Sequence, residues 1–224
     1  MRDSYARFFS EGYITKEQFF EFGLSETIYA SLDSAREAWE NLKYRIDHNQ
    51  DVYIRSFGRN AANSHLFLDF YKKVLENENI KIDPTNNAEP TKLIKELTGY
   101  SKTKNRKYEL IRNYQVSHVF GRTKNAFTFT APWNIVYMPK LLDPFTGHEA
   151  TGDLVLEYQK RFQSKIYNHF SDLIEDYNNL LIKNSYQEKI DDYLIGLSNT
   201  NKHSLKDIGK LKNAVKGEFT PISI

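Results

Sequence analysis

Three stretches near the middle of the chain decide the fold: YQVSHVFGRTKN at residues 114–125, APWNIVYMP at 131–139 and TGHEA at 146–150. The first contains a short apolar run that ends at His118. The second contains another apolar run that Asn134 opens, and in the third His148 starts an amphipathic segment. The polar residues at the borders of these segments therefore follow the order His, Asn, His.

This order resembles the motif of the HNH nucleases, whose ββα-metal module is a small hairpin followed by a helix, and the resemblance covers roughly residues 111 to 165. It implies that His118 is the general base that deprotonates a water, which a neutral imidazole can do near pH 7. It also implies that Asn134, on the second strand, hydrogen-bonds across the loop and orients His118. His148, at the start of the helix, is the implied ligand of a divalent metal ion.

The chain departs from the family pattern in two places. Many HNH nucleases carry an Asp directly before the catalytic His as a second metal ligand, and this chain has Ser117 there. Ser117 is the second candidate ligand, with Gln115 and Asp143 as alternatives. The interval between Asn134 and His148 is also longer than in compact HNH motifs. We expect Mg²⁺, with Mn²⁺ or another borderline ion as an alternative because imidazole ligands favour such ions.

The segment from residue 101 to 125 is basic, with a net charge of +6, whereas the whole chain carries +2. Such a local cluster attracts the phosphates of a nucleic acid. The same composition is also typical of a solvated connecting loop. The candidate DNA contacts in this segment are Lys102, Lys104, Arg106, Lys107, Arg122 and Lys124.

A second candidate for DNA contact lies at the predicted junction between a strand at residues 51–55 and the next helix. Arg55 and Arg59 flank a glycine there, where backbone donors and arginines can hold a phosphate or read guanine. The alternative is that the two arginines are an ordinary surface pair.

Composition limits the remaining classes. With 224 residues, 40% of them hydrophobic, the chain can bury one good core or two small ones. It has no Cys, which excludes a disulfide framework and Cys-rich zinc knuckles. Since no apolar run reaches the length of a membrane span and the N-terminus does not resemble a signal peptide, we expect a cytoplasmic protein that does not enter membranes.

Capping and periodicity predict the other elements. Thr15 with Gln18 forms a capping box before a helix that Gly23 would end, and a second short helix is expected from about residue 25 to 32. Phe19, Gly23 and Ile28 also fit a helix-turn-helix that could read DNA, with plain helical packing as the alternative. Further helices are expected after Ser34, around residues 66–74 and at 91–97.

The strongest periodic signal follows the motif. Apolar residues at a spacing of three or four predict one long amphipathic helix from about residue 148 or 152 to 181. From residue 198 onward the composition predicts a weakly ordered tail with one short helix near 205–215.

Together these patterns predict an α+β fold, a mostly helical protein around a central ββα-metal module. The expected regions are a DNA-recognition part at 1–100, the nuclease module at 101–182 and a C-terminal extension at 183–224. The expected function is metal-dependent cleavage of double-stranded DNA by a homodimeric type II restriction enzyme. The alternatives are a nicking, homing or phage-defence nuclease of the same family, and a DNA-binding regulator without catalysis.

Overall fold

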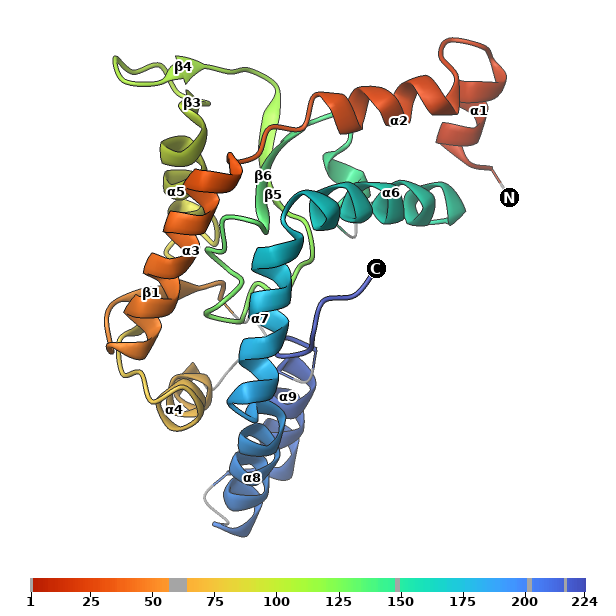
Figure 1. Ribbon diagram of the computed structural model, residues 1–224. Coiled ribbons are helices and arrows are strands. Elements are labelled where there is room, and N and C mark those ends of the chain that lie inside the picture. Colours follow the sequence, from red (N-terminus) through yellow and green to blue (C-terminus); the bar gives the residue numbers. More distant parts are fainter. Residues whose placement is uncertain (1, 57–63, 148–149, 201–202, 216) are drawn as a thin grey trace.

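The computed structural model describes residues 2–56, 64–147, 150–200, 203–215 and 217–224. The fold is α+β, about half helical with three small two-stranded sheets (Figure 1). The described helices are α1 (Ser4–Ser10), α2 (Lys16–Ser25), α3 (Leu32–Asp47), α4 (Ser64–Val74), α5 (Ala88–Thr98), α6 (Asp153–His169), α7 (Ser171–Lys183), α8 (Tyr186–Asn199) and α9 (Leu205–Val215), with a 3₁₀ turn, η1, at Asp143–Phe145. None of these helices is long and apolar enough to cross a membrane.

The three sheets differ in their pairing. β1 (Val52–Ile54) and β2 (Ile80–Ile82) are parallel, as are β3 (Tyr100–Ser101) and β4 (Glu109–Leu110). β5 (Tyr114–His118) and β6 (Ile135–Pro139) form an antiparallel hairpin in which His118 is opposite Ile135. The prediction of a strand at residues 51–55 is confirmed, whereas β3 and β4 were not predicted.

The main hydrophobic core contains residues from most parts of the chain, including Phe20 of α2, Trp133 before β6 and Leu211 of α9. A second, smaller cluster consists of Ile94, Val116, Ile135 and Tyr137. At the centre of the main core the rings of Trp39 and Trp133 lie 5.7 Å apart, and the ring of Tyr177 in α7 lies 5.5 Å from that of Trp133. Because the chain has no Cys, disulfides do not stabilise the fold, and the burial of these large aromatic rings contributes to its stability.

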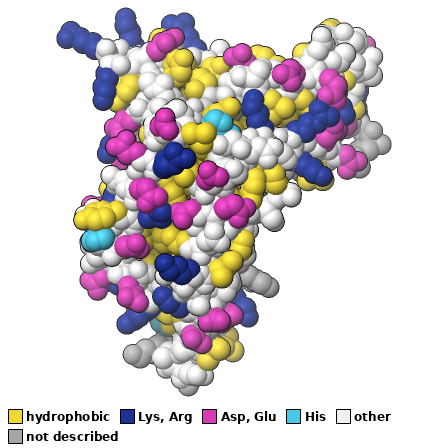
Figure 2. Space-filling view, viewed as in Figure 1, with side chains coloured by type: hydrophobic (Ala, Val, Ile, Leu, Met, Phe, Trp, Pro, Cys, Tyr) yellow, Lys and Arg dark blue, Asp and Glu magenta, His cyan; other side chains and the backbone are white. Residues whose placement is uncertain are grey.

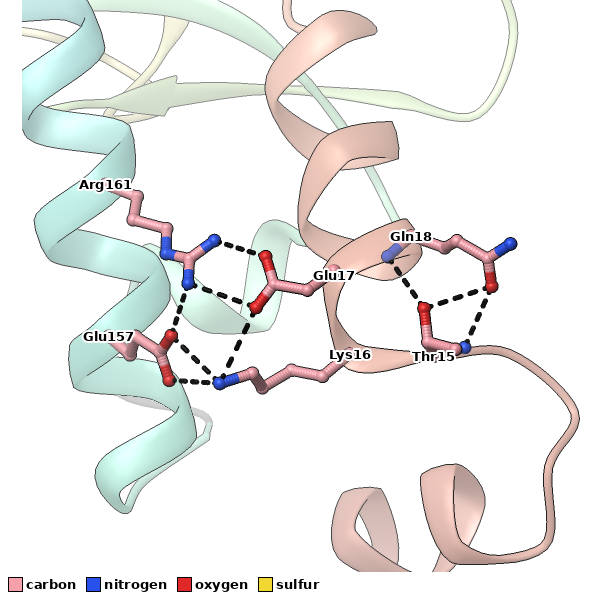
Figure 3. Close-up of polar contacts among 6 residues, drawn as sticks. All are labelled: Thr15, Lys16, Glu17, Gln18, Glu157 and Arg161. Carbon is pink, nitrogen blue, oxygen red and sulfur yellow. Dashed lines mark hydrogen bonds and ion pairs between the residues drawn. The ribbon is translucent and has the colours of Figure 1, made fainter.

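Helix α2 is fixed to α6 by polar contacts as well as by the core (Figure 3). The capping box of Thr15 and Gln18 starts α2 as predicted. Lys16 Nζ lies 2.8 Å from a carboxylate oxygen of Glu157, and Arg161 pairs with both Glu17 and Glu157. This ion cluster is half exposed, so we assign it an orienting role and little stability.

Several local expectations are corrected near the N-terminus. Gly23 lies inside α2, where an added Cβ would meet Tyr158 and Leu142, rather than in a turn or at the helix end. Ile28 is extended and pairs with Tyr137 of β6, so no second helix follows directly and no helix-turn-helix forms there. The helix expected after Ser34 begins at Leu32, capped by Ser31.

The long C-terminal helix is two helices. Phe170 ends α6 and starts α7, and Figure 1 shows that the two run in different directions. Phe170 is buried against Tyr29, so the bend lets both helices cover the core. The tail is better packed than expected: besides α9, Phe219 and Ile222 are buried.

Candidate functional site

The β5–β6 hairpin positions the two predicted catalytic residues at one end. His118 is the last residue of β5, and Asn134 precedes the first residue of β6. The main-chain amide of Val119 donates to the oxygen of Asn134 at 2.9 Å, which continues the ladder one step beyond the strands. The intervening residues 119–134 form a buried, turn-rich connection.

The imidazole of His118 is held by that connection. Its Nε2 lies 2.9 Å from the main-chain oxygen of Phe129, and its ring stacks on the Phe129 ring with centroids 5.4 Å apart. Because a carbonyl oxygen only accepts, Nε2 carries the proton, and Nδ1 keeps its lone pair in the neutral ring. Among the described residues, none forms a hydrogen bond with Nδ1. This atom can therefore accept a proton from a water.

The charge state of His118 follows from its surroundings. Burial lowers the pKa of His118 to about 4, partly opposed by the hydrogen bond to Phe129, while Arg55 lowers it and Asp83 raises it. The imidazole is consequently neutral at pH 7. A neutral imidazole is the form that a general base requires.

Asn134 fixes the connection that carries Phe129. It is fully buried and uses both ends of its amide: Oδ1 accepts from the amide of Phe120 at 2.8 Å, and Nδ2 donates to the oxygens of Gly121 and Thr128 at 3.0 and 2.9 Å. Asn134 therefore joins both ends of the connection and positions Phe129 indirectly. Among the described residues, the side chain of Asn134 forms no hydrogen bond with His118.

Of the two predicted metal ligands, Ser117 lies in the described part of the chain. The hydroxyl of Ser117 is buried and lies 2.7 Å from that of Thr146, and alternation along a strand turns it away from His118. His148 lies outside the described residues. Among those that are described, no group of three or more His, Asp or Glu side chains could hold a metal ion. The described residues thus do not form the expected ligand set, and the metal stays a prediction.

Several predicted DNA contacts have structural partners. Arg122 donates to Thr220 Oγ1 and to the oxygen of Pro221 at 3.1 and 2.9 Å, which ties the C-terminal segment to the connection. The amide of Lys124 donates to the carboxylate of Glu218. The guanidinium of Arg122 thus has a structural role within the chain, and its predicted phosphate contact stays a prediction.

The remaining basic candidates lie at two places. Lys102, Lys104, Arg106 and Lys107 follow β3 and lead into β4, and all except the half-buried Lys102 are exposed. Arg55 follows β1, and its amide donates to the oxygen of Thr123 in the connection after His118. Arg59 lies outside the described residues.

Comparison with known proteins assigns the chain to a family. The model of a family described as "Uncharacterised protein PM1201" matches residues 30–224. The chain belongs to this family. The protein PM1201 of Pasteurella multocida (strain Pm70) is similar over 219 residues with 39% identity, covering 97% of this chain and 92% of that protein. No solved structure matches the chain.

The PM1201 family match includes the β5–β6 hairpin, its connection and α6, and starts after α2. Sequence reasoning missed two features of the hairpin. The oxygen of Phe129 is a main-chain atom, so no residue type could indicate it. Lys140, which follows β6, lies outside the basic segment, and only the pairing of the strands brings it near Lys102.

Proposed function

We propose that this protein is an HNH-type nuclease that hydrolyses phosphodiester bonds of double-stranded DNA with His118 as general base. The observation that carries this proposal is the contact between His118 Nε2 and the main-chain oxygen of Phe129, which leaves Nδ1 as the proton acceptor. Two neighbouring features support it: Asn134 bridges the connection, and a helix follows the hairpin.

Helix α6 contacts the hairpin next to His118 through polar side chains. Gln163 of α6 donates to the oxygen of Val119, directly after His118, at 3.0 Å. Gln159 donates to the oxygen of Phe145 at 2.8 Å and so holds the segment between β6 and α6. These two contacts connect α6 to the hairpin and to the segment that follows it, which supports the proposal.

In the proposed reaction His118 takes a proton from a water at Nδ1. The water oxygen attacks phosphorus, and the bond from phosphorus to the leaving oxygen breaks while that oxygen gains a proton from solvent. The imidazolium that forms is stabilised by its Nε2 hydrogen bond to Phe129, because the bond strengthens when the donor is charged. A divalent ion would stabilise charge on the phosphate, but the described residues assign it no ligand set and we route no step through it.

In its most specific form, the proposal is that the protein is a type II restriction enzyme that acts as a homodimer. The length of the chain outside the motif would serve to read the target. A nicking, homing or phage-defence nuclease would use the same His118 chemistry. The alternative outside the nucleases is a regulator that binds DNA without cutting it. In such a protein His118 would only pack against Phe129.

The experiment is incubation of the full chain with mixed-sequence supercoiled plasmid and either Mg²⁺ or Mn²⁺. We expect nicked or linear products that disappear when EDTA removes the ion. Discrete fragments would favour a sequence-specific enzyme, and nicks alone a nicking enzyme. Binding of the plasmid without cleavage in either metal would contradict the nuclease and favour the regulator.

A further inference from the structure

Three cations converge at the end of the hairpin opposite His118. Lys102, Arg112 and Lys140 line one pocket of about 390 Å³ together with Asn113 and Gln115. Two sets of main-chain contacts build it: the amide of Ile111 donates to Ser101, and that of Lys140 donates to Asn113 at 2.8 Å. The strand pairs thus place these cations, distant in sequence, around one space.

The charges of this pocket are not balanced within the described chain. Burial lowers the pKa of Lys102, and the nearby charge of Lys140 lowers it further, while Asp143 raises it. None of the three cations forms an ion pair with a described carboxylate. Bringing like charges together is unfavourable, and an anion in the pocket would offset that repulsion.

We propose that the pocket of Lys102, Arg112 and Lys140 binds a backbone phosphate of duplex DNA other than the one that is cleaved. This proposal rests on the proposed function and names a contact that fixes the DNA on the hairpin. β5 separates the pocket from His118 by four residues, or about 13 Å at ~3.3 Å per residue. The phosphate in the pocket would therefore be a different one from the phosphate that is attacked.

A polymer fits this site better than a free phosphate because the cations continue beyond the pocket. Lys104, Arg106 and Lys107 are exposed between β3 and β4. Figure 2 shows dark blue side chains projecting at the end of the molecule where Figure 1 places these strands. A row of cations that leads away from a pocket matches successive phosphates of a backbone.

The first test measures affinity for a 20-base-pair duplex by fluorescence anisotropy over a salt series, in EDTA so that no cleavage occurs. Lys102→Ala and Lys140→Ala should each weaken binding for all sequences and flatten the slope of log K against log salt by about 0.9. Lys183→Ala, an exposed lysine at the end of α7, is the matched control and should leave the slope unchanged. Unchanged slopes in both pocket variants, or no binding by the wild type, would overturn the proposal.

The second test identifies the source of the phosphate. Lys102 is half-buried and its pKa is lowered, which favours the neutral amine that an amine-acylating reagent attacks at pH 8. We expect the duplex to protect Lys102 at concentrations near its dissociation constant, as read by mass spectrometry. Equal protection by inorganic phosphate at the same concentration would show a free-anion site and overturn the DNA assignment.

The two proposals fail separately. If the chain binds duplex DNA with the expected salt dependence but never cleaves it, the nuclease proposal is wrong and the proposed phosphate contact in the pocket is supported. If the chain cleaves DNA while both pocket variants keep the salt dependence of the wild type, the proposed phosphate contact is wrong and the nuclease proposal is supported.

Discussion

His118 Nε2 lies 2.9 Å from the main-chain oxygen of Phe129, and the two aromatic rings stack with an interplanar angle of 15°. This contact fixes both the tautomer and the orientation of the imidazole without using a second ionisable group. It makes the position of the candidate base depend on the buried connection between β5 and β6. The predictions below separate the chemistry of this base from the packing that holds it.

The stability of the protein should depend on pH through His118. Its pKa is lowered to about 4, below that of an unfolded histidine near 6.5. Between these values the unfolded chain binds a proton that the folded chain does not, so the free energy of unfolding falls as the pH falls through this window. We expect the loss to be about 3 kcal/mol, with full stability above about pH 6.5.

Urea denaturation at a series of pH values measures this effect. His118→Gln removes the titrating group and keeps a donor for Phe129, so its stability should decline less between pH 6.5 and 4. Carboxylates contribute equally to both proteins and cancel in the comparison. Parallel curves for the variant and the wild type would refute the buried, neutral imidazole.

Asn134→Ala should destabilise the connection and the site together. The change removes three hydrogen bonds at a fully buried position and leaves their main-chain partners unpaired. We expect a loss of about 2–4 kcal/mol in the free energy of unfolding and a slower cleavage at saturating metal. Asn179→Ala, at the exposed neighbour of a buried asparagine in α7, is the control. A stable Asn134 variant would show that the bridge is dispensable.

Gly23→Ala should destabilise the contact between α2 and α6. An added Cβ would lie 2.5 Å from the Tyr158 hydroxyl and 2.6 Å from Leu142 Cγ, so the helices must move apart. We expect a loss of about 1–3 kcal/mol by thermal or chemical denaturation. The matched control is Gly209→Ala in α9, where the space is open; it should raise stability by up to about 1 kcal/mol. Equal effects of both changes would contradict the close packing.

Arg122→Ala distinguishes a structural from a DNA-contacting arginine. Because its guanidinium donates to Thr220 and Pro221, we expect a loss of about 1–2 kcal/mol and faster proteolysis of the C-terminal segment. Arg36→Ala, whose side chain is largely exposed in α3, is the control. Normal stability combined with weaker binding of all DNA sequences would instead return Arg122 to the phosphate contact that its sequence position predicts.

Local signals in the sequence predicted much of the fold. The capping box at Thr15 and the helices expected after Ser34, around residues 66–74 and at 91–97 are all present. Each depends on neighbours within one helical turn. The bend between α6 and α7 at Phe170 could not be predicted in this way, because the apolar spacing of the sequence continues through it. The directions of the two helices depend on how each packs against the core.

The candidate site shows the same limit. His118 and Asn134 could be selected from their residue types and their order. The acceptor at Phe129 could not be predicted, because it is a main-chain oxygen that every residue type carries. The cluster of Lys102 and Lys140 depends on strand pairing between distant segments. The structural role of Arg122 depends on a C-terminal segment whose composition indicated disorder, although its buried Phe219 and Ile222 were an available apolar signal.

The most direct test of the central claim is the single-turnover rate of DNA cleavage by the wild type, His118→Ala and His48→Ala at saturating metal and DNA. His48 is an exposed histidine at the end of α3 and serves as the matched control. Loss of a positioned base should slow the His118 variant by about 10²–10⁴-fold without weakening DNA binding, and added imidazole should restore part of the rate. Cleavage by His118→Ala at the wild-type rate, or the same loss in His48→Ala, would contradict the assignment of His118 as the general base.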